Sequence, residues 1–302
     1  MPDLLSVYDF DKRASDAFIS EASKMEALLK KGKPLRILAG KIVANMFFET
    51  STRTNFSFQS AAARLGATPL AFYSDKSSAQ KGESFSDTIQ IIDGYVDCLV
   101  IRHPQPGMPQ LAAEIANHPV INAGDGGNQH PSQALIDIYT IKKLKGKIDG
   151  LNVTLMGDLK HARAMRSLLH LLAMYGANIS LCSPSLLAMG PEVVLRAKKE
   201  FGANIREMTK PSFAKCDILY LCRVQRERFA DQDEALRLSQ EFRLSMNALR
   251  AAPKSMAVLH PLPKIDELPK EFDSDARAKY FEQAKNGVPA RMAILKRCCL
   301  GK

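Results

Sequence analysis

Short apolar runs alternate with amphipathic stretches along most of the chain. A short continuous apolar run predicts a buried strand, whereas apolar residues spaced three and four positions apart predict a helix. The predicted strands lie near 42–48, 69–73, 97–101 and 119–122, and then near 151–156, 178–182, 217–222 and 256–259. The predicted helices are an opening helix and those near 53–65, 83–95, 106–117, 131–145, 161–175, 191–202 and 275–297.

This alternation predicts an α/β protein. Parallel strands need helical crossovers, so each series of strands is expected to form a parallel β-sheet flanked by helices on both faces. Two successive series predict two domains, and the helix that begins at Pro131 and ends before Gly146 is expected to join them. A chain of 302 residues is long enough for two domains of ordinary size.

The composition predicts a soluble, cytoplasmic protein. Hydrophobic residues make up 46% of the chain and charged residues 25%. The longest apolar runs are strand-sized, and the first residues lack the basic and apolar regions of a secretion signal. The six cysteines form no Cys-x-x-Cys pair and have no histidine at metal-binding spacing. We therefore expect reduced cysteines, no metal, no cofactor and no membrane partner.

The net charge of +10 raises the question of nucleic-acid binding. Aromatic residues make up only 7% of the chain, and no predicted strand carries paired aromatics for base stacking. The basic residues are also scattered over helix faces rather than gathered in one segment. A basic site for small anionic substrates accounts for part of the excess, so no nucleic-acid partner is expected.

The segment Ser51-Thr52-Arg53-Thr54 follows the first predicted strand and opens the next predicted helix. A helix start offers unpaired backbone N–H groups and the positive end of the helix dipole. Three hydroxyls and a guanidinium added there make a pocket for a tetrahedral anion, most simply a phosphate. The alternative is an ordinary N-cap, but a cap does not need Arg53 beside it.

Polar clusters follow the other predicted strands as well, and the carboxyl ends of strands are where open parallel sheets bind ligands. These clusters are Glu49 beside the first segment, Arg102-His103-Pro104, 122–133, 157–163, 223–228 and His260-Pro261-Leu262-Pro263. Each one alone is a weak signal, because an arginine or a His-Pro pair after a strand is common.

Taken together and in order, these blocks resemble the aspartate/ornithine transcarbamoylase family from residue 40 to residue 300. The resemblance is to the aspartate branch, and it implies transfer of the carbamoyl group of carbamoyl phosphate to the amino group of L-aspartate. The products would be N-carbamoyl-L-aspartate and phosphate, in an early step of pyrimidine synthesis. The implied carbamoyl phosphate-binding domain is 1–131 plus 289–302, and the aspartate-binding domain is 146–280, with linking helices at 132–145 and 281–288.

The resemblance assigns one set of residues to carbamoyl phosphate. These are Ser51, Thr52, Arg53, Thr54, Arg102, His130, Gln133, Pro261 and Leu262. Four of them, Arg53, Thr54, Arg102 and His130, are expected to be catalytic. Thr54, Arg102 and His130 would donate to the carbamoyl oxygen and stabilise the charge that develops there, and Arg53 would hold the phosphate. The amide of Gln133 and two backbone carbonyls would accept from the carbamoyl amine. The family pattern also predicts a cis peptide bond before Pro263.

A second set is assigned to aspartate, because guanidinium groups bind carboxylates bidentately. This set is Lys81, Arg163, Arg223, Gln225 and Leu262. Ser77 and Lys81 would come from a neighbouring subunit, which implies a homotrimer with shared active sites; the alternative is an ordinary connecting loop. Glu49 is expected to pair with Arg163 and Arg228 when the domains close. No general base is required, since the leaving phosphate can take the amine proton.

Several positions depart from the usual aspartate-branch pattern. Ala164 lacks a hydroxyl that would contact the aspartate carboxylate, and Thr50, Asn55, Gln80 and His161 also differ. The rivals are ornithine carbamoyltransferase, which usually carries a His-Cys-Leu-Pro block, and a non-catalytic subunit that senses a phosphate metabolite. A dinucleotide oxidoreductase would need three glycines where this chain has one. The sequence leaves open whether a regulatory chain associates.

Overall fold

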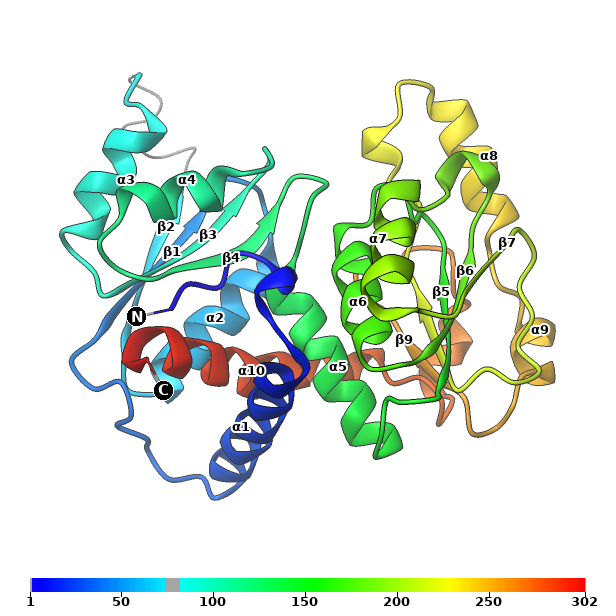
Figure 1. Ribbon diagram of the computed structural model, residues 1–302, viewed down its shortest axis with the longest axis horizontal. Coiled ribbons are helices and arrows are strands. Elements are labelled where there is room, and N and C mark those ends of the chain that lie inside the picture. Colours follow the sequence, from blue (N-terminus) through cyan, green and yellow to red (C-terminus); the bar gives the residue numbers. More distant parts are fainter. Residues whose placement is uncertain (1, 74–81, 302) are drawn as a thin grey trace. The chain divides into compact units, whose positions relative to one another are not determined.

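The computed structural model describes residues 2–73 and 82–301 and divides into two compact units (Figure 1). The N-terminal unit comprises Met1–Tyr139 and Asn286–Lys302, and the C-terminal unit comprises Thr140–Lys285. Two helices, α5 (Pro131–Lys145) and α10 (Tyr280–Leu300), contain the residues at which one unit gives way to the other. The family-based assignment of each substrate to one domain remains a prediction.

The N-terminal unit is built on a parallel four-stranded sheet in the order β2-β1-β3-β4. Its strands are β1 (Ile42–Phe47), β2 (Thr68–Tyr73), β3 (Cys98–His103) and β4 (Val120–Asp125). Its helices are η1 (Val7–Asp9), α1 (Lys12–Lys30), α2 (Thr52–Arg64), α3 (Phe85–Asp93) and α4 (Met108–Ile115). Helices α3 and α4 cover one face of the sheet, and α2 and α10 lie on the other (Figure 1). Parallel pairing with helices on both faces confirms the predicted architecture.

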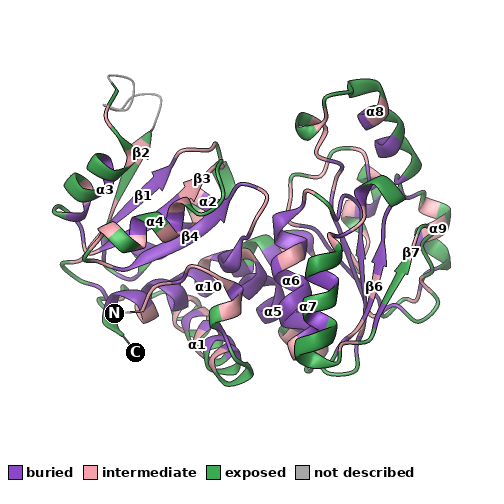
Figure 2. Cartoon of the chain, turned by 45° about the horizontal axis from the view of Figure 1, so that its top comes forward, coloured by how far each residue is buried: buried purple, intermediate pink, exposed green. Residues whose placement is uncertain are grey.

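The alternation of side chains along β1 explains how its two faces are filled. Ala44 and Met46 pack with Leu99 and Ile101 of β3 against α3 and α4. Every residue from Val43 to Phe47 is buried, which is the pattern of a strand covered on both sides (Figure 2). Edge strand β2, in contrast, is mostly exposed or half-buried in the chain as described.

The C-terminal unit contains a parallel five-stranded sheet in the order β7-β6-β5-β8-β9. Its strands are β5 (Asn152–Met156), β6 (Asn178–Cys182), β7 (Ile205–Met208), β8 (Ile218–Leu221) and β9 (Ala257–Leu259). Its helices are α6 (Arg163–Met174), η4 (Ser185–Leu187), α7 (Pro191–Phe201), η5 (Arg226–Arg228), α8 (Gln232–Glu241), α9 (Met246–Ala251) and η6 (Lys270–Ser274). One core cluster joins β5, β8 and β9 to Phe242, Phe272 and Tyr280.

Most predicted elements are present, and the differences have physical causes. Strand β7 was not predicted, because only its first residue is buried and no apolar run marks it. Helix α8 was missed because its ten residues are mostly polar and bury only three side chains. Strands β3 and β4 continue to His103 and Asp125, so Arg102 and Asn122 lie inside strands rather than after them. The last helix begins at Tyr280, five residues later than predicted.

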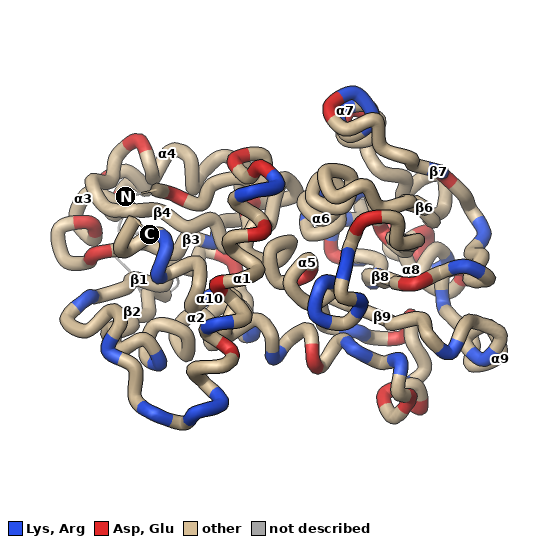
Figure 3. Tube along the Cα trace, turned by 60° about the horizontal axis from the view of Figure 1, so that its bottom comes forward, with Lys and Arg blue, Asp and Glu red and all other residues tan. Residues whose placement is uncertain are grey.

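The distribution of charge, the helices and the metal-binding side chains indicate no function of their own. Lys and Arg are dispersed along both units rather than concentrated on one element (Figure 3). In residues 2–73 and 82–301, no helix combines the length and apolar character needed to cross a bilayer. The same described residues contain no group of three or more His, Cys, Asp or Glu side chains able to hold a metal ion.

Candidate active site

The order of strands in the N-terminal unit reverses between β1 and β3. The chain leaves β1 through α2 to reach β2 on one side, whereas β3 connects through α4 to β4 on the other. Open parallel sheets bind ligands at the carboxyl ends of strands beside such a switch point. Both Ser51, at the start of α2, and Arg102, near the end of β3, lie at this point. The topology therefore brings the predicted anion site to the place where this fold class binds ligands.

Ser51 occupies the N-cap position of α2 without acting as a side-chain cap. Its backbone is extended, with φ −157° and ψ 96°, and its side chain makes no capping hydrogen bond. Thr52 and Arg53 are exposed, and Thr54 is buried at the same helix start. The simple N-cap interpretation is therefore insufficient, because the hydroxyl is not used to satisfy a backbone N–H group. The first turn of α2 has the donors of an anion site.

Arg102 is held at the switch point by strand pairing and by an acidic neighbour. It is in register with Phe47 of β1, and its carbonyl accepts a 2.8 Å hydrogen bond from the N–H of Phe48. Its Nε lies 3.1 Å from Oε2 of Glu49, which is an ion pair by distance although its direction is not that of a hydrogen bond. Glu49 thus has a partner in its own unit. Its predicted pairing with Arg163 and Arg228 stays a prediction.

His130 and Gln133 lie at the start of α5. The His130 side chain is buried, and its Nδ1 lies 3.3 Å from Oγ of Ser132. The His130 carbonyl accepts hydrogen bonds from the N–H groups of Gln133 and Ala134, which closes the first turn. Gln133 Nε2 donates a 2.8 Å hydrogen bond to Oδ1 of Asp137. Both side chains of the predicted carbamoyl-recognition pair are therefore fixed by contacts within the N-terminal unit.

The C-terminal unit has its own switch point, between β5 and β8. After β5 the chain turns at Gly157, where φ is 119° and an added Cβ would lie 2.1 Å from the carbonyl oxygen of Cys222. Only glycine fits such an approach. The next residue, Asp158, is fully buried and accepts hydrogen bonds from the backbone N–H groups of His161 and Gln225. Asp158 therefore joins the loop after β5 to the loop after β8.

Arg223 follows β8 and is held by an internal carboxylate. Its Nη1 and Nη2 donate to the two carboxylate oxygens of Glu227 at 2.8 Å and 2.5 Å, and Nη1 also donates to the carbonyl of Val224. The hydrogen bonds from the Arg223 guanidinium lower the pKa of Glu227, so this carboxylate is ionised at neutral pH. The Nη edge of Arg223 is thus occupied, while the guanidinium has further N–H donors on its other edge.

The remaining predicted aspartate contacts lie in the loop after β8 and at the start of α6. Gln225 accepts a 3.0 Å hydrogen bond from Nε of Arg228 through its side-chain carbonyl. Arg163 is the first residue of α6 and is 9% exposed. Ala164 is also buried, and as an alanine it has no hydroxyl where the family usually carries a threonine. The carboxyl ends of β5 and β8 therefore carry two guanidinium groups and an amide.

The loop after β9 is organised by His260, which sequence reasoning did not assign. Its Nδ1 accepts a 2.8 Å hydrogen bond from the N–H of Leu262, and its Nε2 lies 2.7 Å from Oε1 of Glu267. Burial lowers the pKa of His260, although Glu267 opposes that effect. The Leu262–Pro263 peptide bond is cis, as predicted, and Leu262 has a φ of 58°. The backbone that carries the Pro261 and Leu262 carbonyls is therefore fixed by a buried pair.

Two of the predicted site residues belong to the segment 74–81. Ser77 and Lys81 lie outside the described residues, so their contribution from a neighbouring subunit stays a prediction.

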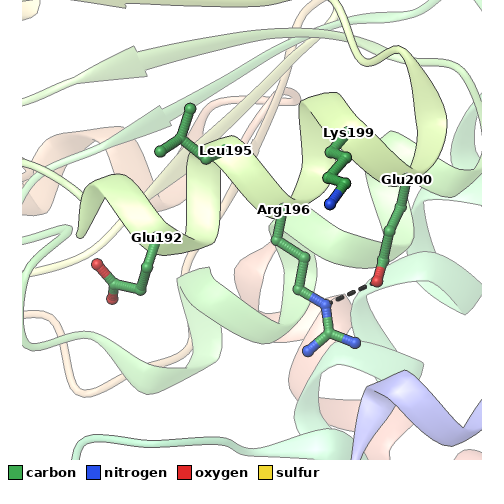
Figure 4. Close-up of a pocket in the computed structure, with 5 residues that line it drawn as sticks. All are labelled: Glu192, Leu195, Arg196, Lys199 and Glu200. Atoms are coloured by element: carbon green, nitrogen blue, oxygen red, sulfur yellow. Dashed lines mark hydrogen bonds and ion pairs between the residues drawn. The ribbon is translucent and has the colours of Figure 1, made fainter.

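A surface hollow of about 490 Å³ is lined by Glu192, Leu195, Arg196, Lys199 and Glu200 (Figure 4). All five residues belong to α7, and Arg196 Nε donates to Glu200 at 2.9 Å. This hollow contains none of the predicted site residues, so we assign it no role in the chemistry.

Comparison with known families identifies both halves of the chain. Residues 2–143 match the carbamoyl-P binding domain of aspartate/ornithine carbamoyltransferase, and residues 149–298 match the Asp/Orn binding domain. The chain belongs to the aspartate/ornithine carbamoyltransferase family. Membership confirms the resemblance and the fold drawn from the ordered motifs.

Several curated relatives are named aspartate carbamoyltransferase catalytic subunit. The protein from Thermococcus kodakarensis is 45% identical, over 97% of this chain and 95% of its own length. The protein from Archaeoglobus fulgidus is 43% identical, over 99% of this chain and 100% of its own. These are relatives of the aspartate branch, which is the branch that the sequence favours.

Solved structures of family members have the same fold. Aspartate transcarbamoylase from Trypanosoma cruzi in complex with carbamoyl phosphate and aspartate is 37% identical, with a TM-score of 0.92, and the match covers 97% of this chain and 95% of that one. The catalytic subunit from M. jannaschii is 39% identical, with a TM-score of 0.90, and the match covers 99% of this chain and 98% of that one. The likeness therefore extends over both units.

Proposed function

We propose that this chain transfers the carbamoyl group of carbamoyl phosphate to the amino group of L-aspartate, giving N-carbamoyl-L-aspartate and phosphate. Family membership over both halves and the aspartate-branch relatives support this reaction. The observation that carries it is the chemistry at the two switch points. One has an anion-binding helix start beside Arg102, and the other has Arg163, Arg223 and Gln225. An acyl phosphate and a dicarboxylate are the ligands that match these two sets.

Carbamoyl phosphate is proposed to bind first, at the start of α2. The N–H groups and hydroxyls of residues 51–54, together with Arg102, hold the phosphate. Thr54, Arg102 and His130 donate to the carbamoyl oxygen, and Gln133 with the carbonyls of Pro261 and Leu262 accepts from the carbamoyl amine. As the aspartate amine attacks, negative charge grows on the carbamoyl oxygen, and donors already in position stabilise it. The departing phosphate takes the amine proton, so no side chain needs to act as a base.

Aspartate is proposed to bind through Arg163, Arg223 and Gln225, with Lys81 from a neighbouring subunit. Bidentate guanidinium contacts distinguish a dicarboxylic amino acid from ornithine, whose distal group is a cation. The loop after β9 reads His260-Pro261-Leu262-Pro263, so Pro261 stands where the ornithine branch usually carries a cysteine. The missing hydroxyl at Ala164 predicts that aspartate is held by one contact fewer.

A homotrimer is the proposed assembly, and large apolar side chains exposed on the N-terminal unit support self-association. They are Phe56 (69%), Leu70 (44%), Tyr73 (56%), Ile91 (46%) and Tyr95 (65%). Three chains of 33.3 kDa predict a particle of about 100 kDa by light scattering. We propose a cytoplasmic enzyme of pyrimidine biosynthesis, and the name catalytic subunit of its relatives fits an associated regulatory chain.

One assay tests the proposed reaction. The purified chain is incubated with carbamoyl phosphate and either aspartate or ornithine, and phosphate release is followed above the rate of spontaneous breakdown. We expect turnover with aspartate and none with ornithine. Turnover with ornithine alone would reverse the choice of branch, and binding of carbamoyl phosphate without turnover would favour a non-catalytic subunit.

A further inference from the structure

Gln133 is fixed by a buried carboxylate one turn further along α5. Its Nε2 lies 2.8 Å from Oδ1 of Asp137, at the i,i+4 spacing that brings helix side chains together. Asp137 has no exposed surface, whereas Gln133 is half-buried. The contact therefore holds one end of the Gln133 amide from the interior of the N-terminal unit.

A carboxylate at this place determines which end of the amide faces it. An amide has a donating N–H₂ end and an accepting oxygen end, and many surroundings tolerate either orientation. An ionised carboxylate only accepts hydrogen bonds, so Asp137 favours the N–H₂ end and opposes the oxygen end. Oε1 of Gln133 then points away from Asp137. An accepting oxygen is what a carbamoyl amine requires as a partner.

A second buried charge, that of Arg291 on α10, offsets the free-energy cost of burying the Asp137 carboxylate. Arg291 is 4% exposed, and the negative charge of Asp137 favours its cationic form. Burial lowers the pKa of Arg291 to about 9, with Arg102 adding to the effect, so Arg291 remains a cation at neutral pH. A buried carboxylate without a nearby cation would be costly or would take up a proton. Arg291 therefore helps to keep Asp137 in its accepting form.

The position of Arg291 is set by a ring on α2 and by a glycine on its own helix. Its guanidinium carbon lies 4.9 Å from the centre of the Phe58 ring, and Phe58 belongs to α2, the helix that opens with the anion site. A Cβ at Gly287 would lie 2.7 Å from Arg291 Nη1, so a glycine one turn earlier leaves room for the guanidinium. Nε of Arg291 has no hydrogen-bond partner among the described residues, which points to charge rather than directed bonding as its role.

We propose that Asp137 and Arg291 are positioning residues that orient the amide of Gln133, so that the site distinguishes the carbamoyl amine from an oxygen. The inference rests on the proposed function in one respect, that Gln133 contacts the carbamoyl group. It adds the reason why Gln133 presents its oxygen, and it assigns a purpose to a buried charge pair outside the proposed set of substrate contacts.

Ligand binding without aspartate tests this inference. Calorimetry measures the Kd of carbamoyl phosphate, which carries the amine, and of inorganic phosphate, which does not. Asp137→Asn can present its own N–H₂ to Gln133 and so removes the preference between the two orientations. We expect it to weaken carbamoyl phosphate binding about 10-fold, the effect of one misdirected hydrogen bond, and to change phosphate binding less than about twofold.

A double-mutant cycle separates positioning from general damage. If Asp137 acts through Gln133, Asp137→Asn should have no further effect on carbamoyl phosphate binding in the Gln133→Ala background. Arg291→Gln should weaken the binding of carbamoyl phosphate more than that of inorganic phosphate. Arg291→Lys keeps the positive charge and should therefore retain most of the wild-type affinity. The matched control is Asp93→Asn. Asp93 is another buried carboxylate of this unit, which accepts from the N–H groups of Asn117 and His118, and its variant should leave both Kd values unchanged.

The outcomes separate this inference from the proposed function. Two results would overturn the positioning role and leave the function intact, provided that the wild-type protein binds carbamoyl phosphate. One is that Asp137→Asn and Gln133→Ala weaken carbamoyl phosphate binding additively. The other is that Asp137→Asn weakens the binding of both ligands equally. Wild-type protein that binds phosphate and carbamoyl phosphate equally would overturn both, because no carbamoyl recognition would then exist.

Discussion

The two switch points present hydrogen-bond donors by different means. At the start of α2 the donors include backbone N–H groups and the Ser51 hydroxyl, which makes no cap of its own. After β8 the donor is a long side chain, Arg223, held bidentately by Glu227. Backbone donors are fixed by the fold itself, whereas a flexible guanidinium must be ordered by a neighbour. The comparison teaches that the proposed phosphate site depends mainly on the start of its helix, whereas the proposed aspartate site depends on a long side chain that Glu227 orients.

The largest expected effect follows from removing a donor at the N-terminal switch point. Arg53→Ala and His130→Ala should each lower kcat by roughly 10²–10³, because each removes a donor that stabilises charge in the transition state. Steady-state kinetics at saturating substrates measure this loss, with circular dichroism as the check on folding. A loss below about 10-fold in both well-folded variants would remove these residues from the catalytic set.

A smaller effect is expected at the C-terminal switch point. Arg223→Ala should raise the KM for aspartate by about 10²-fold or less, because a charged hydrogen bond is lost. Glu227→Gln should raise the same KM by about 10-fold, because the Arg223 guanidinium is no longer held in one orientation. The KM for carbamoyl phosphate should stay within about twofold in both. The control is Arg196→Gln, in an exposed ion pair on α7. Equal changes in both KM values would show that the two half-sites are not separate.

Acid should weaken the C-terminal unit more than the N-terminal one. Burial lowers the pKa of His170 to about 4 and also lowers that of His260, so both are neutral in the fold. The unfolded chain takes up these protons below about pH 6.5, and stability is therefore lost as pH falls from there toward 4. His170 alone should account for on the order of 1–3 kcal/mol.

Hydrogen exchange between pH 7 and 4.5 measures this loss in each unit. His170→Gln, which cannot take up the proton, should flatten the pH dependence in the C-terminal unit and leave the N-terminal unit unchanged. The role given to His170 would be contradicted if acid lowered the stability of both wild-type units equally and if His170→Gln had the same pH dependence as the wild-type protein.

The smallest effect concerns the cap of α2. Because Ser51 makes no capping hydrogen bond, Ser51→Ala should change the free energy of unfolding by less than about 0.5 kcal/mol. Ser84 does cap α3, by accepting from the N–H of Asp87, and Ser84→Ala should cost about 1 kcal/mol. Urea unfolding compares the two variants. A loss at Ser51 as large as at Ser84 would restore the simple capping role.

The sequence predicted most elements because apolar runs and helical spacing reflect burial directly. It placed Ser51 and Arg102 near strand ends, since polar residues after apolar runs mark the ligand-binding edge of a parallel sheet. It did not reveal Asp158 or His260, because a carboxylate or imidazole that orients a group far away in the chain has no characteristic spacing. Asp137 and Glu227 follow Gln133 and Arg223 by four residues, a spacing that brings helix side chains together but is too common to mark a positioning role. Only the contacts in the fold show which carboxylates orient another group.

The central claim is that separate switch points hold the two substrates. A crystal structure of the wild-type protein with carbamoyl phosphate and succinate, a dicarboxylate that has no attacking amine, tests it directly. We predict the phosphate within hydrogen-bond distance of residues 51–54 and Arg102, and succinate carboxylates on Arg163 and Arg223. Phosphate bound away from the start of α2, or succinate bound without either arginine, would contradict the account.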